Sequence, residues 1–202
     1  MIFNGSGDPP IDKILYERYF LGKRNGIFIE SGAYDGVFES VCKVLEDKMD
    51  WSGFNIEPNP VMYSRLVKNR PKATNLNCAI SSVNGKSSFR QPFLDKYGLE
   101  NTWGTLEVDK YESGTVFEVE TITFCHLIEK YHISKVDLWV LDVEGHEQRA
   151  IEGMIQSTTF PRVICAEHGH CGLGRLSEWM KGAGYTYDGS HLQDSFFVVG
   201  GA

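Results

Sequence analysis

The chain has 202 residues, of which 42% are hydrophobic and 23% are charged, and its net charge at pH 7 is −7. This length and composition predict one globular domain over residues 1–202, with a buried core of its own. The negative charge argues against partners held by bulk electrostatics, so we expect no nucleic acid and no anionic membrane surface to bind.

Hydrophobic periodicity alternates along the chain between the patterns of strands and helices. A helical N-terminal segment at residues 1–24 comes first, and an irregular insert at residues 94–115 interrupts the alternation. The predicted helices cover residues 11–22, 37–49, 60–70, 124–131, 146–155 and 173–184. The predicted strands cover residues 26–30, 52–58, 73–81, 86–93, 136–144, 162–168, 185–189 and 194–200.

This order of elements is typical of an α/β protein. Strands that alternate with helices, and that read as nearly continuous apolar runs, indicate a parallel sheet covered on both faces. The last two strands lie too close together in the sequence for a crossover helix, so they should pair as an antiparallel hairpin. The predicted fold is therefore a doubly wound, mostly parallel sheet with an antiparallel C-terminal hairpin.

Functional groups are expected where the strands end, because ligands of open α/β sheets bind outside the carboxyl ends of the strands. The segments at these ends are residues 30–36, 57–59, 78–79, 142–146 and 167–170. Acids at such positions can simply cap the helix that follows. Because four of the five segments carry a carboxylate, a ligand site is the better interpretation.

The turn at residues 30–36, ESGAYDG, leaves two classes of ligand open. A dinucleotide needs the pattern Gly-x-Gly-x-x-Gly, with its pyrophosphate at the N-terminus of the helix. Here Tyr34 stands in place of the middle glycine, and Glu30 and Asp35 would repel a pyrophosphate. S-Adenosylmethionine has no phosphate and carries an ammonium and a sulfonium group. The acidic turn therefore favours S-adenosylmethionine over a nicotinamide dinucleotide.

Four segments of the chain match a known set of motifs in their order. They read FIESGAYDGVFES, WSGFNIEPNPVMYSRLVKNRP, NLNCAIS and VDLWVLDVEGHEQRAIEGM. In these segments, which lie between residues 26 and 153, the chain resembles the FkbM-type methyltransferases; IEPNP and LDVEGHE are the most specific parts. The resemblance implies a Rossmann-like class I methyltransferase fold and S-adenosylmethionine-dependent methyl transfer to a hydroxyl of a small molecule or glycan.

The resemblance also implies which residues contact the methyl donor. These are Glu30, Gly32, Ala33, Tyr34, Gly36, Glu57, Pro58, Asn59, Cys78, Ala79 and Asp142. Glu30 and Gly32 would line the methionine part of the donor, and Glu57 would hold the ribose. Cys78 and Ala79 would flank the adenine. The insert at residues 94–115 matches no motif of the family; because it interrupts the alternation of strands and helices, we expect it to cover the acceptor and help to select it.

Methyl transfer to a hydroxyl requires a group that removes the proton, because an aliphatic alcohol is a poor nucleophile at neutral pH. The candidates are Asp142, His146, Glu167 and His168, and also Glu144 and His170 in the same segments. By the resemblance, Asp142 would lie near the reacting methyl group. Two mechanisms remain open. In one, a histidine is the base and Glu167 orients it. In the other, Asp142, Glu167 and His168 bind Mg²⁺ or Mn²⁺, which acidifies the hydroxyl.

The cysteines predict neither disulfides nor a zinc site. The five cysteines are odd in number and lie mostly in apolar segments, which is typical of free thiols in a reducing compartment. The run CAEHGHC at residues 165–171 lacks the spacing of structural zinc sites, and Cys165 is expected in the core. Since we find no signal peptide and no apolar run of about 18 residues, we expect a cytoplasmic location and no membrane span.

Two further functions remain as alternatives. One is a nicotinamide-dependent oxidoreductase, which the missing middle glycine disfavours, and the other is a module that binds S-adenosylmethionine without catalysis. The expected partner is a small-molecule or glycan acceptor, and the sequence makes no prediction of oligomeric state. Two roles stay open for Tyr97, Trp103 and Tyr111 in the insert: their rings either stack on a sugar or pack a surface loop.

Overall fold

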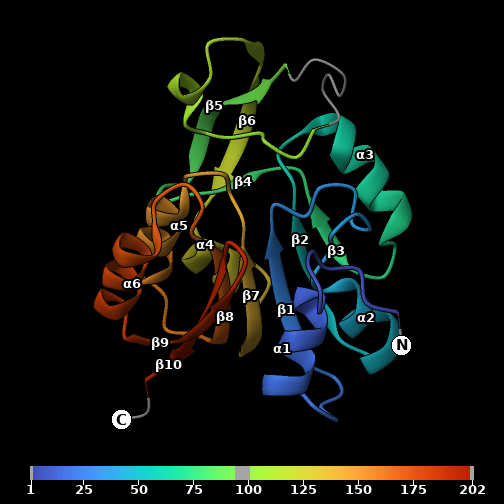
Figure 1. Ribbon diagram of the computed structural model, residues 1–202. Helices are drawn as coiled ribbons and strands as arrows, with labels where there is room; N and C mark the ends of the chain where they lie inside the picture. Colours follow the sequence, from blue (N-terminus) through green and yellow to red (C-terminus); the bar gives the residue numbers. More distant parts are fainter. Residues whose placement is uncertain (1, 94–100, 201–202) are drawn as a thin grey trace.

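The computed structural model describes residues 2–93 and 101–200 (Figure 1). The helices are α1 (Ile11–Tyr19), α2 (Lys43–Met49), α3 (Pro60–Asn69), η1 (Val108–Lys110, a 3₁₀ helix), α4 (Phe124–Lys130), α5 (Glu147–Met154) and α6 (Leu173–Gly182). The strands are β1 (Ile27–Ser31), β2 (Ser52–Ile56), β3 (Thr74–Leu76), β4 (Ala79–Ile80), β5 (Gly85–Pro92), β6 (Gly114–Ile122), β7 (Val136–Leu141), β8 (Pro161–Glu167), β9 (Tyr185–His191) and β10 (Asp194–Val199). None of the described helices is both long and apolar enough to cross a membrane.

Seven strands form the main sheet in the order β3-β2-β1-β7-β8-β10-β9. β1 pairs in parallel with β2 and β7, and the pairs β2–β3 and β7–β8 are also parallel. β10 runs antiparallel to both β8 and β9. The predicted doubly wound sheet with an antiparallel C-terminal hairpin is therefore confirmed. The order along the sheet reverses between β1 and β7, which makes this pair the switch point.

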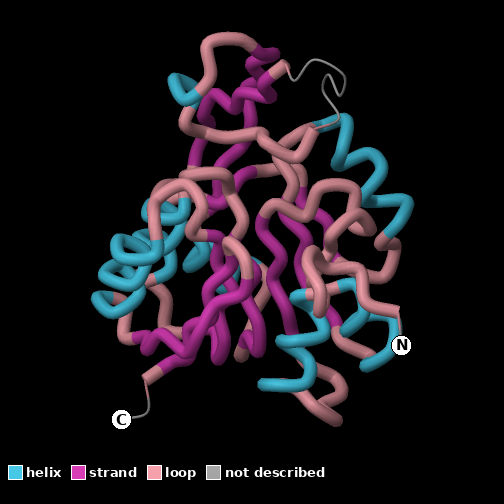
Figure 2. The backbone as a smooth tube through the Cα atoms, viewed as in Figure 1, coloured by secondary structure: helices cyan, strands magenta, loops and turns pink. Residues whose placement is uncertain are grey.

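Both faces of the main sheet are buried under helices (Figure 2). Neighbouring residues of a strand face opposite sides, so each central strand contributes to two cores. In β1, Phe28 packs with α1 and α2, whereas Ile29 packs with α4, α5 and α6. In β7, Leu138 faces the same side as Phe28, and Trp139 faces the same side as Ile29. All four of these side chains are fully buried. Burial on both sides explains why these strands read as unbroken apolar runs.

Side chains near the strand ends decide where the next helices begin. α3 begins as predicted after Asn59, whose side-chain oxygen accepts the backbone N–H groups of the first turn. The predicted start of the preceding helix at residue 37 is wrong, because α2 begins only at Lys43. The Glu30 carboxylate accepts the N–H groups of Val41 and Cys42 at 2.8 and 3.1 Å, which holds the segment before α2 as a loop.

A second sheet, with the order β4-β6-β5, was not predicted. It lies beyond the carboxyl ends of the central strands (Figure 1). No strand was predicted at β6, although its alternation of apolar and charged residues is a strand signal. The single strand predicted over residues 73–81 is also wrong, since its first half is β3 in the main sheet and its second half is β4 in this one.

Candidate functional site

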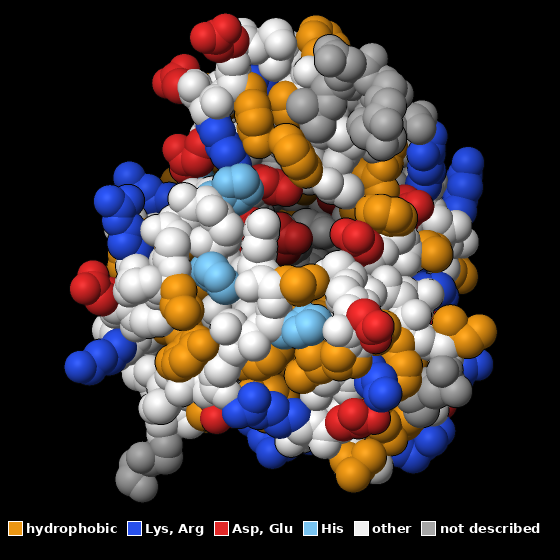
Figure 3. All heavy atoms as spheres, viewed as in Figure 1, with side chains coloured by type: hydrophobic (Ala, Val, Ile, Leu, Met, Phe, Trp, Pro, Cys, Tyr) orange, Lys and Arg blue, Asp and Glu red, His pale blue; other side chains and the backbone are white. Residues whose placement is uncertain are grey.

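A cavity of about 500 Å³ opens where β1, β2, β7 and β8 end, and the second sheet and residues 101–106 line its other side. It corresponds to the hollow in the face shown in Figure 3, where acidic side chains lie in and beside the opening. All residues predicted to contact the donor line this cavity except Gly36 and Cys78. The cavity therefore occupies the switch point, where doubly wound sheets bind their ligands.

Gly36 and Cys78 have roles in packing. Gly36 has a φ of 76°, and a Cβ at this position would come within 2.6 Å of side-chain atoms of Arg70 and Leu66. Glycine is therefore needed for the turn to pack on α3, and not for the approach of a ligand. Cys78 is 8% exposed and belongs to the core under β4. Its neighbour Ala79, also predicted beside the adenine, is the residue that reaches the cavity.

Gly32 fixes the turn that follows β1. Its φ is 85°, and a Cβ at this position would overlap the backbone carbonyl oxygen of Asp142. The N–H groups of Gly32 and Ala33 donate to the carbonyl oxygen of Ile56 at 3.0 and 3.1 Å. The turn is thus held against the ends of both β2 and β7. Any larger residue at position 32 would push apart the two strands of the switch point.

Glu57 follows β2 and lines the cavity, and the residue is only 6% exposed. Its two oxygens accept the backbone N–H groups of Tyr34 at 2.9 Å and Asn59 at 2.7 Å. Burial raises the pKa of Glu57 to about 8, although these two hydrogen bonds act to lower it. Each oxygen has a further lone pair, so the carboxylate can still accept two hydrogen bonds from a ligand.

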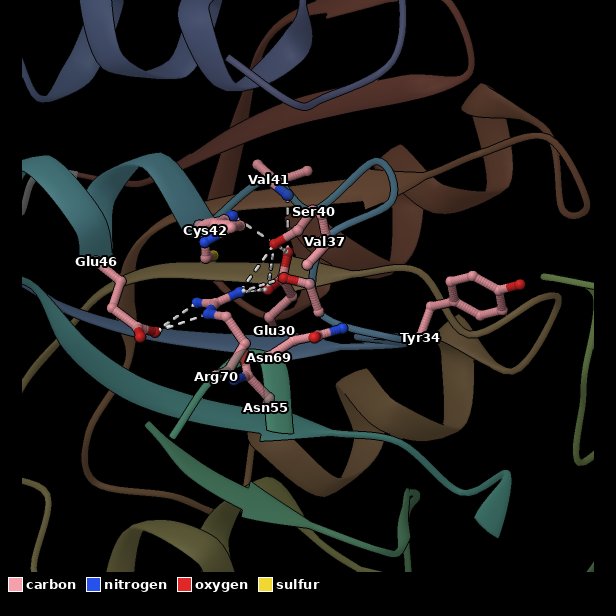
Figure 4. A network of polar contacts seen from close by, with 12 residues as sticks. Glu30, Tyr34, Val37, Ser40, Val41, Cys42, Glu46, Asn55, Asn69 and Arg70 are labelled. Carbon is pink, nitrogen blue, oxygen red and sulfur yellow. Dashed lines mark hydrogen bonds and ion pairs between the residues drawn. The ribbon is translucent and has the colours of Figure 1, made fainter. Parts of the chain in front are cut away.

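Glu30 lines the cavity, but its carboxylate is engaged by protein groups (Figure 4). It accepts hydrogen bonds from Ser40 Oγ and from the loop before α2, and Arg70 Nη1 lies 3.4 Å from its Oε2. Arg70 is fully buried and also pairs with Glu46 at 2.7 Å. These contacts indicate that Glu30 and Arg70 shape the loop at residues 36–42, part of which lines the cavity.

Five carboxylates gather at the ends of β7 and β8, and we call them the acid group. They are Asp142, Glu144, Glu147, Glu167 and Asp194. Burial and the charges of Glu144 and Glu147 raise the pKa of Glu167 to about 8, and burial raises that of Asp194 to about 6. Asp142 faces the open cavity but lies deep in the protein. Loss of solvation there, together with the charge of Glu167, raises the pKa of Asp142. Burial also raises the pKa of Glu144, so Asp142, Glu144, Glu167 and Asp194 are unusually basic carboxylates.

Sequence reasoning missed two members of the acid group as site residues: Asp194, which begins β10, and Glu147, because a glutamate in the first turn of a helix is ordinary. Glu147 is fully buried, and its Oε1 accepts the N–H of Gly145 at 3.0 Å. Among the described residues, neither Glu147 Oε2 nor the equally buried Glu167 Oε2 has a hydrogen-bond partner. Unpaired buried oxygens of this kind are rare in proteins and often mark a functional site.

The three predicted histidine positions differ in what they contact. His146 lines the cavity, with Nδ1 2.6 Å from Glu107 Oε1 and Nε2 3.0 Å from Ser81 Oγ, so both ring nitrogens are engaged. His168 is not in the cavity lining, because its Nδ1 lies 2.8 Å from Ser195 Oγ on β10.

His170 reaches the acid group in place of His168. Its Nε2 lies 2.5 Å from Glu144 Oε2 and 3.7 Å from Glu167 Oε2. The structure therefore brings Glu144, Glu167 and His170 together. Of the predicted metal ligands Asp142, Glu167 and His168, only Glu167 is in this set. Cys165 is fully buried in the core, as expected.

The described part of the insert lines the cavity together with the second sheet. Thr105 pairs with Arg90 of β5, and its hydroxyl donates to the backbone carbonyl of Glu144 at 3.0 Å. Trp103 lines the cavity and is 48% exposed. Tyr111 packs its ring against Lys110 outside the lining, and Tyr97 lies outside the described residues.

The cavity lining is strongly acidic. Seven of its residues are aspartate or glutamate, namely Glu30, Glu39, Glu57, Asp142, Glu144, Glu167 and Asp194. In the part of the chain that the structure describes, no lysine or arginine lines it. The site therefore suits a ligand that carries positive charge, and it would repel an anion such as a pyrophosphate.

The strand order and the ligand-sized cavity at the switch point define a Rossmann-like α/β fold of the methyltransferase type. Two solved structures share this fold. One is a methyltransferase FkbM from Methylobacillus flagellatus, with a TM-score of 0.55 and 13% identity over 90% of this chain and 46% of that one. The other is the precorrin-6y C5,15-methyltransferase of Geobacter metallireducens, with a TM-score of 0.52 and 11% identity over 97% and 92% of the two chains.

The chain belongs to the FkbM methyltransferase family, because the model of the methyltransferase FkbM domain matches residues 30–187. It is 25% identical to the hexuronic acid methyltransferase AglP of Haloferax volcanii, over 96% of this chain and 77% of that protein. The chain is thus an S-adenosylmethionine-dependent methyltransferase. The alternative of a nicotinamide-dependent oxidoreductase is therefore wrong. The residues present fit this donor, since the acidic lining suits a sulfonium and Glu57 retains lone pairs for ribose hydroxyls.

Proposed function

We propose that this protein methylates a hydroxyl oxygen of a sugar or of another polyhydroxylated small molecule. The observation that carries the proposal is the acid group, which places basic carboxylates in the same cavity as the Gly32 turn and Glu57. A hydroxyl must lose its proton during transfer, and carboxylates of raised pKa accept protons well near neutral pH. The name of the relative AglP, a hexuronic acid methyltransferase, supports a sugar acceptor.

Glu57, Gly32 and Asn59 would hold the donor, whose sulfonium supplies an electrophilic methyl group. Glu57 would accept hydrogen bonds from the ribose hydroxyls with its remaining lone pairs. The Gly32 turn, pinned against β2 and β7, would keep the methionine part beside the end of β7. The network of Glu30 and Arg70 would contribute indirectly, by fixing the loop at residues 36–42.

Asp142 is our assignment for the proton acceptor. Its backbone carbonyl oxygen packs against Gly32, so it lies next to the donor half of the cavity. Its side chain faces the cavity, whereas both ring nitrogens of His146 are already engaged and His168 is turned toward β10. One carboxylate oxygen of Asp142 would accept the hydroxyl proton while Trp103 and the rest of residues 101–106 hold the acceptor.

The test uses S-adenosylmethionine with a trideuterated methyl group and a panel of neutral sugars and hexuronic acids. We expect the label on a hydroxyl oxygen of at least one sugar, located by tandem mass spectrometry. Asp142→Asn should lower turnover by about 10²–10⁴-fold while donor affinity stays unchanged. Asp47→Asn, at an exposed site on α2, is the matched control. Donor binding without label transfer to any acceptor would favour the non-catalytic binding module instead.

A further inference from the structure

Three side chains at the edge of the acid group converge in the manner of metal ligands. One ligand atom each from Glu144, Glu167 and His170 lies within 4.8 Å of the other two. Glu144 and Glu167 line the cavity, and both side chains are only 13% exposed. They come from two neighbouring strand ends, the segment after β7 and the end of β8. The arrangement is therefore fixed by the sheet and not by a single loop.

Two buried carboxylate oxygens, one of them in a ligand and one in the neighbouring Glu147, have no hydrogen-bond partner among the described residues, which is a second sign that a cation binds here. Glu147 is fully buried, and its Oε2 makes no hydrogen bond within the described residues; the same is true of Glu167 Oε2. Among the described residues, Lys110 is the lysine or arginine that pairs with the acid group, and its Nζ lies 3.7 Å from Glu144 Oε2. Several carboxylates thus share one lysine, and buried charges without compensation are costly.

We propose that Glu144, Glu167 and His170 bind a divalent cation, Mn²⁺ or Mg²⁺, at the wall of the cavity. Two carboxylates with one imidazole suit these cations, which prefer oxygen ligands. Adjacent ligands of an octahedral ion at about 2.1 Å are about 3 Å apart. The present separations from His170 Nε2 are 2.5 and 3.7 Å, so they would need to change by about 0.5 and about 0.7 Å.

This inference rests on the proposed function, because it explains how such an acidic cavity can hold a polyhydroxylated acceptor. Three protein ligands leave about three positions of an octahedral ion open, and Glu144 and Glu167 belong to the cavity lining. Neighbouring hydroxyls, or a hydroxyl and the carboxylate of a hexuronic acid, can occupy such positions. A cation there would neutralise part of the acid group, which would otherwise repel a uronate.

The test measures binding of Mn²⁺ alone, by the loss of the electron paramagnetic resonance signal of free Mn²⁺. We expect one bound Mn²⁺ per chain that Mg²⁺ displaces. Glu167→Gln and His170→Ala should each weaken binding about tenfold or more. Glu178→Gln and His126→Ala, both at exposed sites on helices, are the matched controls and should bind as the wild type does. His170 is exposed and follows β8, so its variant should fold even if Glu167→Gln does not.

Two results would overturn the inference: no Mn²⁺ binding by the wild-type protein, or equal binding by a folded His170→Ala variant. Binding of S-adenosylhomocysteine to the same samples, measured by calorimetry, separates this inference from the proposed function. If S-adenosylhomocysteine binds and Mn²⁺ does not, only the metal site is lost. If Mn²⁺ binds and S-adenosylhomocysteine does not, the donor site fails while the metal site stands.

Discussion

Replacing Glu57 with alanine should weaken the binding of S-adenosylmethionine about 10- to 150-fold, or by about 1.5–3 kcal/mol. The magnitude follows from the two oxygens of Glu57, each of which already accepts one backbone N–H and retains a lone pair for a ribose hydroxyl. Hydrogen bonds to a charged group contribute about 1.5–3 kcal/mol, so the affinity is measured at about pH 9, above the raised pKa of Glu57, where its carboxylate is ionised. Glu57→Gln should restore only part of the affinity, because its amide group would face one of the two donating N–H groups.

Isothermal titration calorimetry with S-adenosylmethionine and S-adenosylhomocysteine is the assay, run well below the melting temperature of each variant. Glu17→Ala is the matched control, since the Glu17 side chain is 58% exposed on α1, away from the cavity lining. A dissociation constant for Glu57→Ala within about twofold of the wild-type value would remove Glu57 from the ribose site. Equal losses in Glu57→Ala and Glu17→Ala would likewise refute the reasoning.

Three more predictions concern stability, pH and the acceptor. Arg70→Met should lower the free energy of unfolding in urea by about 3–5 kcal/mol, because it leaves two buried carboxylates unpaired; Arg149→Met, at a 60% exposed site, should change it by less than about 0.5 kcal/mol. The pKa of Glu57 is raised from 4.5 to about 8, so the folded state holds this proton more tightly than the unfolded state does. The donor-free protein should therefore lose stability as pH rises from about 5 to 8, by at most about 5 kcal/mol from this group. Urea unfolding at both pH values should show a smaller loss for Glu57→Gln, and an equal loss would contradict the assignment. Trp103→Ala should raise KM for a sugar acceptor about three- to tenfold and leave the donor dissociation constant unchanged; a collapse of donor affinity would place Trp103 at the donor site.

Local patterns were sufficient to predict the main sheet. β1 and β7 are buried on both faces of the sheet. An unbroken apolar run in the sequence predicts this kind of burial. Asn59 followed by Pro60 marks the start of α3, because an N-cap and a proline at the first helical position act within one turn. The cavity could be placed for the same reason, since the carboxyl ends of parallel strands meet at one edge.

Long-range side-chain partners were not predictable in this way. His168 and His170 are two residues apart just beyond β8, and the pairing of His168 with Ser195 on another strand decides which ring meets the acid group. Glu30 was expected to face the donor, but Arg70 and the loop before α2 engage its carboxylate. Such contacts depend on how distant segments pack, and neither periodicity nor turn chemistry encodes that.

The most direct test of the central claim, that the cavity binds the methyl donor, is mass spectrometry of small molecules released from the purified protein. The wild-type protein should retain S-adenosylmethionine or S-adenosylhomocysteine, and Glu57→Ala purified in parallel should retain much less. Release of a nicotinamide dinucleotide, or equal amounts of the methyl donor from both proteins, would contradict the assignment of this cavity as the donor site.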